Sequence, residues 1–259
     1  MSESGSQPNL LVATPIAGGV VTHDYMHGIN ALREHLEALG WGMDLVTQPD
    51  GLVTRSRNGF ASAVVRAAKY THLLMIDADV VVEPKGVERL VRSGHDVTGC
   101  AVALRNFNWD RMGEFLSEHP EAQVQDLRAV ATDYAVWFEP GEAVVDGFVR
   151  VHAIGSAVML VSRRALVRIS ESDVVQYARI GLPSPDRHPD GWTFFDPYVD
   201  EHGNYLSEDY ALCDRWRRLD GSVWADLTSR TRHIGPVAIP GDIAASFAAA
   251  ASYAESVDP

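Results

Sequence analysis

The chain has 259 residues, of which 46% are apolar and 22% charged, so it is long enough to bury a sizeable core without disulfides. Its 35 acidic residues outnumber its 22 Lys and Arg, and the formal net charge of −13 weighs against a surface built to neutralise duplex DNA. Two cysteines fit a reducing compartment. The chain has neither an apolar signal-peptide core nor an apolar run of about 20 residues, so we expect a cytoplasmic protein without a membrane span.

The N-terminal part alternates apolar runs with helical patterns. Residues 9–15 (NLLVATP) are apolar and end at Pro15, as expected for a strand buried on both faces. Further strands are predicted over residues 41–46, 71–82 and 96–104, and helices over residues 26–39, 55–69 and 85–92. This βαβαβαβ order predicts an α/β fold with a mainly parallel, doubly wound central sheet.

The C-terminal part is less regular, and residues 105–150 give no interpretable pattern. We predict a strand over residues 151–161 with a Gly–Ser break, and helices over residues 163–169, 208–219 and 244–254. Residues 181–203 are rich in Gly, Pro, Asp and His, and they carry Trp192, Phe194 and Phe195. A long loop with exposed aromatic side chains of this kind is typical of a lid or a substrate platform.

Two carboxylates, Asp77 and Asp79, flank Ala78 at the carboxyl end of an apolar strand. Ligands bind at this end of the strands in open parallel sheets. Residues two apart on a strand point the same way, so the two carboxylates repel each other unless a cation or solvent offsets their charge. A hard divalent cation bound to phosphate oxygens would do so. A solvated strand end is the alternative interpretation.

A second acidic motif, Ser207-Glu208-Asp209, opens the helix predicted from residue 208. Ser207 can cap this helix, and acidic residues in a first turn suit the helix dipole. A catalytic carboxylate and a purely structural helix start therefore both remain open.

His233, in Arg232-His233-Ile234-Gly235, is a candidate metal ligand, because a neutral imidazole binds transition metals such as manganese. A surface or core histidine is the alternative. Arg55 and Arg57 begin a predicted helix, where two guanidinium groups and the helix N-terminus can hold a diphosphate. A solvated helix start is equally consistent with these two residues.

Taken in order, these segments resemble glycosyltransferases of the GT-A fold, and in particular the family-2-like enzymes of bacteria and phages. The resemblance covers residues 9–235, nearly the whole chain. It rests on NLLVATP, TRSRNGF, THLLMIDADVVVEP, VHAIGSAVMLVSRRAL and FFDPYVDEHGNYLSEDYALCDRWRRLDGSVWADLTSRTRHIG. The order of a DxD triplet, a later Glu-Asp pair on a helix and a following His is more specific than any one of these motifs.

The resemblance implies a role for each matching residue. Asp209 would be the general base, and Glu208 would help to place the acceptor. Asp79 and His233 would bind the metal, with Asp77 contacting the metal or the nucleoside. The donor-binding residues would be Thr14, Pro15, Arg55, Arg57, Asn58, Asp77, Ala78, Gly155 and Ser156. Trp192, Phe194 and Phe195 would form a lid that excludes water.

The implied reaction is transfer of a hexosyl or pentosyl group from a UDP- or GDP-sugar to an acceptor hydroxyl, with Mn²⁺ or Mg²⁺ and inversion at the anomeric carbon. The acceptor is left open among a glycan, a protein, a lipid-linked sugar and a modified nucleobase. The resemblance further implies one catalytic domain over residues 1–236, with a nucleotide-sugar half (9–104), an acceptor half (105–236) and a helical tail (237–259). A phage-encoded enzyme of this kind would act in the host cytoplasm.

Two alternatives belong to other functional classes. A sugar nucleotidyltransferase on a related fold would need a basic residue after a Gly-rich loop to hold a triphosphate, and Gly18-Gly19 is followed by no nearby Arg or Lys. A catalytically silent nucleotide-sugar-binding protein would not need the DxD, Glu-Asp and His motifs, all of which are present.

Overall fold

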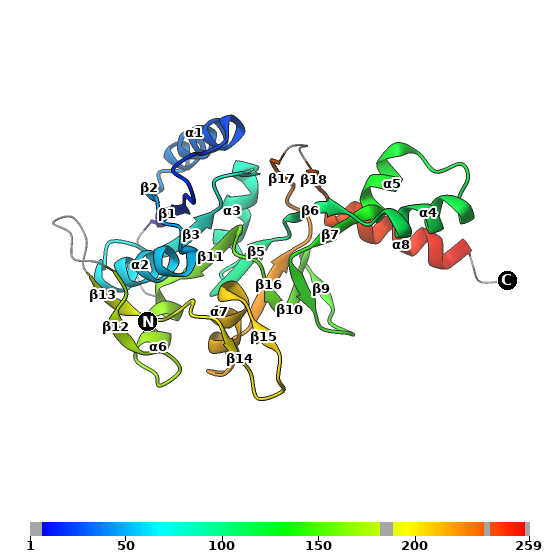
Figure 1. The fold of residues 1–259 in the computed structure, drawn as a ribbon. Helices are drawn as coiled ribbons and strands as arrows, with labels where there is room; N and C mark the ends of the chain where they lie inside the picture. Colours follow the sequence, from blue (N-terminus) through cyan, green and yellow to red (C-terminus); the bar gives the residue numbers. More distant parts are fainter. Residues whose placement is uncertain (1–6, 182–188, 236–238, 257–259) are drawn as a thin grey trace.

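The computed structural model describes residues 7–181, 189–235 and 239–256. Its N-terminal part alternates strands and helices, as predicted (Figure 1). These elements are β1 (Asn9–Pro15), α1 (His23–Ala38), β2 (Gly42–Gln48), α2 (Val53–Arg66), β3 (His72–Ile76), β4 (Val80–Val82), α3 (Pro84–Arg92) and β5 (Val97–Cys100). The predicted strand over residues 71–82 is divided, because the chain turns at Asp77-Ala78-Asp79 between β3 and β4.

The uninterpreted middle of the chain contains regular structure. Its elements are β6 (Ala103–Phe107), α4 (Trp109–Glu118), α5 (Val124–Ala131), β7 (Thr132–Tyr134), β8 (Val136–Phe138) and β9 (Val144–Val145). The next elements are β10 (Phe148–Ile154), β11 (Val158–Ser162) and α6 (Arg163–Ser170). The predicted strand over residues 151–161 is therefore two strands, separated at the Gly–Ser break.

The C-terminal part contains short strands and two helices. They are β12 (Tyr177–Arg179), β13 (Asp190–Trp192), β14 (Tyr198–Val199), β15 (Tyr205–Leu206), α7 (Glu208–Arg217), β16 (Val223–Asp226), β17 (Thr231–His233), β18 (Ile239–Gly241) and α8 (Ile243–Ser256). The predicted helices over residues 163–169, 208–219 and 244–254 correspond to α6, α7 and α8. In the described part of the chain, no helix combines the length and apolar character that crossing a membrane requires.

The central sheet has the strand order β2-β1-β3-β11-β5-β16-β10-β8, with β9 paired to β10. The prediction of a parallel sheet holds for β1, β2 and β3 and for the β5–β16 pair. It is wrong for β11, which is antiparallel to both β3 and β5, and for β10, which is antiparallel to β16 and β8. Strands β10 and β11 are separated in the sheet by β5 and β16, and both run opposite to β3, β5 and β16.

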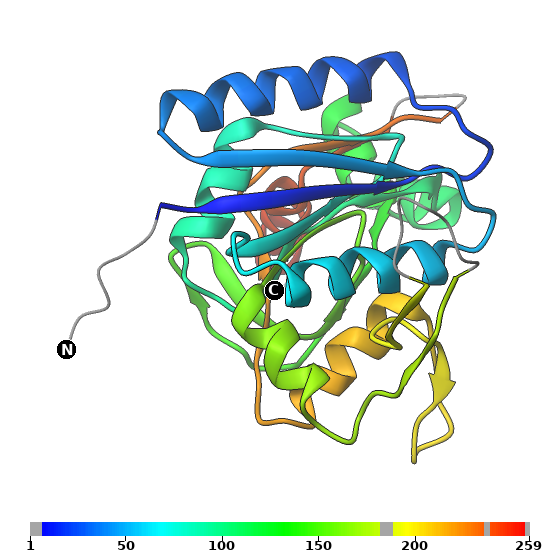
Figure 2. The ribbon, with the colours of Figure 1, turned by 90° about the vertical axis from the view of Figure 1, so that its left-hand side faces the viewer.

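Helices cover both faces of this mixed α/β sheet. Figure 2 shows α1 above the N-terminal strands and α2, α6 and α7 on the opposite side. One buried cluster joins α1 and α3 to the sheet through Leu32, Leu36 and Leu90. The other lies under α2, α6 and α7 and includes Phe60 and Leu212. Strand β3 lies between β1 and β11, so the turn that follows it is anchored from both sides.

Helices α4, α5 and α8 form a lobe beyond β6 and β7 (Figure 1). The hydroxyl of Ser246 on α8 donates to the Ala129 carbonyl on α5 at 3.1 Å, which fixes α8 against α5 within the lobe. The rings of Phe138 and Phe247 also meet, with centroids 5.5 Å apart.

The aromatic loop differs from the prediction. Phe194 and Phe195 are completely buried in the core and therefore are not exposed lid residues. A large apolar side chain in a Gly- and Pro-rich loop is buried in the core when that loop packs on the sheet. Trp192 is partly exposed at the end of β13, and its backbone N–H donates to the Ser62 hydroxyl at 3.1 Å. Residues 182–188 of the predicted loop lie outside the described residues.

Candidate functional site

The turn at Asp77-Ala78-Asp79 is held by backbone hydrogen bonds from three segments. The Asp77 N–H donates to the Ala157 carbonyl at 3.0 Å, and the Ala78 carbonyl accepts from the Thr22 N–H at 3.0 Å. The Asp79 carbonyl accepts from the Ile234 N–H at 2.7 Å. The two carboxylates leave this turn toward different partners, because Asp77 meets Arg57 whereas Asp79 meets His233 and Arg105.

His233 reaches Asp79 because β17 pairs with β4, which places His233 opposite Val80. Its Nδ1–H donates to the Ala103 carbonyl at 2.8 Å, since a carbonyl can only accept. Nε2 is therefore the ring nitrogen that faces Asp79, and it lies 3.5 Å from Oδ2. A carbonyl that orients the second nitrogen of an imidazole is a common support of metal-binding histidines.

Asp79 and His233 shift each other's pKa in opposite directions. Burial acts to raise the pKa of Asp79, but the hydrogen bond and charge of His233, together with Arg105, lower it below its usual value. Burial likewise acts to lower the pKa of His233, whereas Asp79 and the Ala103 carbonyl raise it above 6.5. The charge of Arg105, whose Nη1 lies 2.9 Å from Asp79 Oδ2, offsets the carboxylate charge, and protonation of His233 adds to this effect.

The pair fits a divalent cation. Two ligand atoms at about 2.1 Å from one ion, with an angle between a right angle and a tetrahedral one, lie roughly 3.0–3.5 Å apart. The 3.5 Å separation of Asp79 Oδ2 and His233 Nε2 agrees with this distance. No group of three or more His, Cys, Asp or Glu side chains is placed for a metal within the described ranges.

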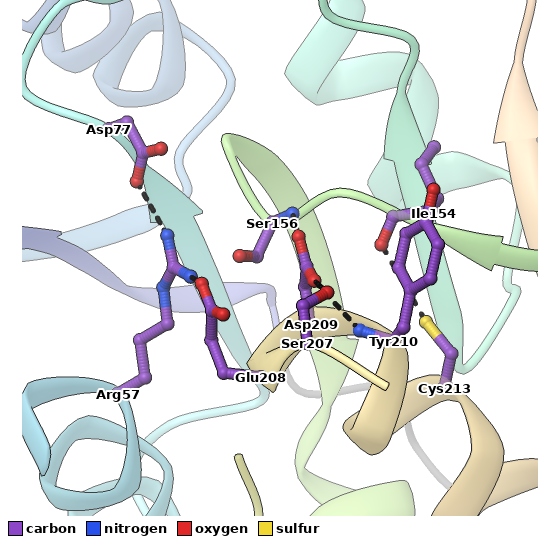
Figure 3. Close-up of polar contacts among 9 residues, drawn as sticks. All are labelled: Arg57, Asp77, Ile154, Ser156, Ser207, Glu208, Asp209, Tyr210 and Cys213. Atoms are coloured by element: carbon purple, nitrogen blue, oxygen red, sulfur yellow. Dashed lines mark hydrogen bonds and ion pairs between the residues drawn. The ribbon is translucent and has the colours of Figure 1, made fainter. Parts of the chain in front are cut away.

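Arg57 connects the triplet to the Glu-Asp motif (Figure 3). Its guanidinium donates to Asp77 Oδ1 at 2.9 Å through Nη2 and to Glu208 Oε1 through Nη1. The Arg57 side chain is only 4% exposed, whereas the two carboxylates retain 28% and 23% exposure. One guanidinium thus joins the start of α2, the end of β3 and the start of α7.

Asp209 lies on the other side of this ion pair, and its carboxylate accepts hydrogen bonds from neighbouring segments (Figure 3). Oδ1 accepts from the Tyr210 N–H at 2.9 Å and from the Ser207 hydroxyl, which bonds Asp209 instead of capping α7. Oδ2 accepts from the Ser156 N–H at 3.3 Å. These donors fix the direction of the carboxylate.

Glycine at position 155 is required by close packing next to Asp209. A Cβ there would lie 2.8 Å from the Ala135 Cβ and 3.5 Å from Asp209 Oδ2. The neighbouring Ser156 is 1% exposed, and its hydroxyl has no hydrogen-bond partner among the described residues. In Figure 3 this hydroxyl points away from Asp209, toward the Arg57–Glu208 pair.

A pocket of about 300 Å³ opens beside the triplet. Its walls come from the loop after β1, the start of α2 and the turn after β3. They include Pro15, Thr22, Arg57, Asp77, Ala78 and Asp79. Arg57 lines this pocket and also bonds Glu208, which precedes Asp209 on α7.

Three predicted donor-binding residues have structural partners of their own. The Thr14 hydroxyl is buried and shares a 2.5 Å hydrogen bond with the Tyr25 hydroxyl. Asn58 is buried and bonds both Asp196 and the Phe195 N–H, at 2.6 and 2.7 Å, so it anchors the segment after β13. Arg55 forms a two-point ion pair with Asp50, which itself lines the pocket.

Sequence reasoning missed Arg105, which lies in the uninterpreted middle of the chain. Arginine is common on exposed strands, and its contact with Asp79 depends on the pairing of β17 with β4 and on the path of β6. Neither is visible in a local pattern. The strands that bring Ala135 and Trp137 close to Asp209 were missed for the same reason.

No family model and no curated protein sequence matches the chain. Among solved structures, the chain is similar to A197 from STIV, with 15% identity, a TM-score of 0.46 and coverage of 88% of this chain and 86% of that one. It is also similar to a glycosyltransferase involved in the glycosylation of the major capsid of PBCV-1. That match has 12% identity, a TM-score of 0.30 and coverage of 61% of this chain and 62% of that one, so the chain spans less than two thirds of its length.

Proposed function

We propose that the chain is a metal-dependent glycosyltransferase that moves a sugar from a nucleotide-diphosphate sugar to an acceptor hydroxyl. One arrangement supports this proposal: a carboxylate–imidazole pair suited to a cation and a separate, oriented carboxylate, connected through Arg57 beside one pocket. Arg57 and Glu208 come from segments 151 residues apart in the sequence, and His233 lies 130 residues from the Ala103 carbonyl that orients it.

The donor would bind in the pocket beside the triplet. Its nucleoside would lie between the loop after β1 and the start of α2, where Pro15 and Val53 supply apolar surface. The diphosphate would lie near Asp79 and His233, which would hold the cation. When bound, a divalent ion such as Mn²⁺ or Mg²⁺ supplies positive charge that stabilises the departing diphosphate.

Asp209 is the proposed general base. Its carboxylate takes the proton of the acceptor hydroxyl while that oxygen bonds to the anomeric carbon, and the bond from this carbon to the diphosphate breaks. The hydrogen bonds from the Tyr210 and Ser156 N–H groups hold the carboxylate in position for this transfer. A single displacement of this kind inverts the anomeric centre.

Ser156 and Glu208 are proposed to position the substrates. The Ser156 hydroxyl has a free hydrogen-bonding capacity within the described part of the chain, and a sugar hydroxyl would satisfy it. Glu208 would keep Arg57 in place and contact the acceptor, as the resemblance implies.

Two variants test the metal and base assignments separately. Calorimetry with UDP and GDP in Mn²⁺ should show metal-dependent binding to the wild type and to Asp209→Asn, but not to Asp79→Ala. With a turnover assay on a nucleotide-sugar panel, Asp209→Asn should lose most of the transfer rate, about 10²-fold or more. Near-native donor affinity in Asp79→Ala, or turnover within a few-fold in Asp209→Asn, would contradict the respective assignment.

The product decides between glycosyl transfer and the nucleotidyltransferase alternative. Release of a nucleoside diphosphate supports the proposal, whereas release of pyrophosphate supports nucleotidyl transfer. Donor binding without turnover on any acceptor would favour the silent binding protein.

A further inference from the structure

An aromatic side chain is presented at the edge of the sheet next to Asp209. Trp137 lies on β8, the last strand in the described sheet order, and is 38% exposed. Its ring packs on the His152 ring, with centroids 4.0 Å apart, and lies 6.3 Å from the ring of Tyr210. The exposed part of this ring offers an apolar face that is suited to stacking on a ligand.

The position of Trp137 relative to Asp209 is fixed by two short chains of contacts. Just before β8, the Ala135 carbonyl accepts from the Gly155 N–H at 2.7 Å, and Gly155 packs against the Asp209 carboxylate. From the other direction, Tyr210 directly follows Asp209 and contacts Trp137. The aromatic surface therefore begins beside the proposed base.

The same surface continues to a polar pocket of about 220 Å³ at the far end of α7, lined in part by Glu139, Arg150 and Arg217. Tyr210 and Arg217 are seven residues apart and share one face of α7, so they are separated by roughly 10 Å along the helix. Arg217 donates to Glu139 Oε1 at 3.1 Å and contacts His152 Nε2 at 2.9 Å. The surface therefore extends from Trp137 and Tyr210 as far as Arg217.

Charge on this surface is balanced. Arg217 pairs with Glu139, and Arg150 pairs with Glu142. Burial and the charge of Arg217 lower the pKa of His152, so the ring beneath Trp137 is neutral at neutral pH. An anionic polymer would find each guanidinium already paired with a carboxylate. A neutral ligand with many hydroxyls would find donors, acceptors and an apolar face.

We propose that Trp137, Tyr210, Glu139 and Arg217 form the acceptor site, and that the acceptor is a neutral oligosaccharide. This inference rests on the proposed glycosyl transfer. A terminal sugar would place its hydroxyl at Asp209, while the apolar face of a following sugar stacks on Trp137. Its remaining hydroxyls would bond Glu139 and Arg217 at the polar end. The surface thus selects a glycan over a nucleic acid as the acceptor.

The test measures sugar binding without catalysis. Wild type, Trp137→Ala, Trp137→Phe and Trp109→Ala are titrated calorimetrically with maltotriose, cellotriose and triacetylchitotriose, each to about 10 mM. Trp109 is a matched control, because it is 68% exposed but lies on α4 in the helical lobe. Binding of UDP with Mn²⁺ is measured on every variant, and it also reports that the variant is folded.

At least one trisaccharide should bind the wild type. Trp137→Ala should weaken this binding at least fivefold, whereas Trp137→Phe and Trp109→Ala should stay within about twofold. Absence of binding by all three sugars, or an equal loss in Trp109→Ala, overturns the proposal. Trp137-dependent binding of a single-stranded oligonucleotide in place of the sugars also overturns it, in favour of a nucleic-acid acceptor. Wild type that binds a sugar but, in Mn²⁺, neither UDP nor GDP contradicts the proposed function and leaves the sugar site standing.

Discussion

Replacing Arg57 with Leu removes the guanidinium that lies between the carboxylates of Asp77 and Glu208. Removing one partner of a buried ion pair typically costs about 3–5 kcal/mol, because a charge is left uncompensated. Here two carboxylates lose their partner, but they keep 28% and 23% of their surface in water, which screens part of the loss. We therefore expect the free energy of unfolding to fall by about 2–4 kcal/mol.

Urea denaturation measures this change as a shift of the midpoint at constant slope. Lys69→Leu is the control, because Lys69 forms an ion pair with Asp44 in which the two side chains are 60% and 49% exposed. Solvent screens an exposed pair, so the control should lose far less stability. Equal losses in the two variants would refute the reasoning.

Three further predictions concern packing and pH. Gly155→Ala should lose about 1–3 kcal/mol of stability in urea denaturation, because its Cβ would lie 2.8 Å from that of Ala135, and adding Ala135→Gly should recover part of the loss. Since the pKa of His233 is raised above 6.5, its ion pair with Asp79 stabilises the fold below that pH and is lost as the pH rises through the raised pKa. His233→Asn should therefore lose more stability near about pH 6 than near about pH 8. The affinity of the wild type for Mn²⁺, measured by calorimetry, should rise from about pH 6 to about pH 8 because the cation displaces a proton. An affinity that does not change with pH would contradict this prediction. Burial lowers the pKa of His72 to about 4, so wild-type stability should fall as the pH decreases from 6.5 toward 4, and His72→Gln should reduce that acid sensitivity in thermal unfolding.

The spacing of apolar and polar residues predicted the strands and helices whose conformation depends mainly on their own residues. The apolar run before Pro15 and the helical spacing of Leu32 and Leu36 follow from periodicity. The turn after Ile76 does not, because it divides a segment that we predicted as one strand. The approach of His233 to Asp79, which was expected from the resemblance, is present in the structure at 3.5 Å.

What local pattern could not supply depends on strand order. The contact between Arg105 and Asp79 depends on β6 lying beside β17, and the position of Trp137 depends on β8 pairing with β10. The burial of Phe194 and Phe195 depends on Asn58, whose side chain fixes the backbone of that segment from a helix more than 130 residues away. Such contacts are set by tertiary pairing, which residue spacing does not encode.

The position of β11 between β3 and β5 has a consequence for how the molecule is made. During synthesis, β3 and β5 are complete long before residues 158–162 leave the ribosome, so both keep an unpaired edge until β11 inserts between them. Exposed strand edges are prone to pairing with other chains. A nascent chain truncated near residue 104 would therefore expose these edges to other chains, and the turn after β3 would gain its hydrogen bonds with Ala157 and Ile234 only after those residues have been translated.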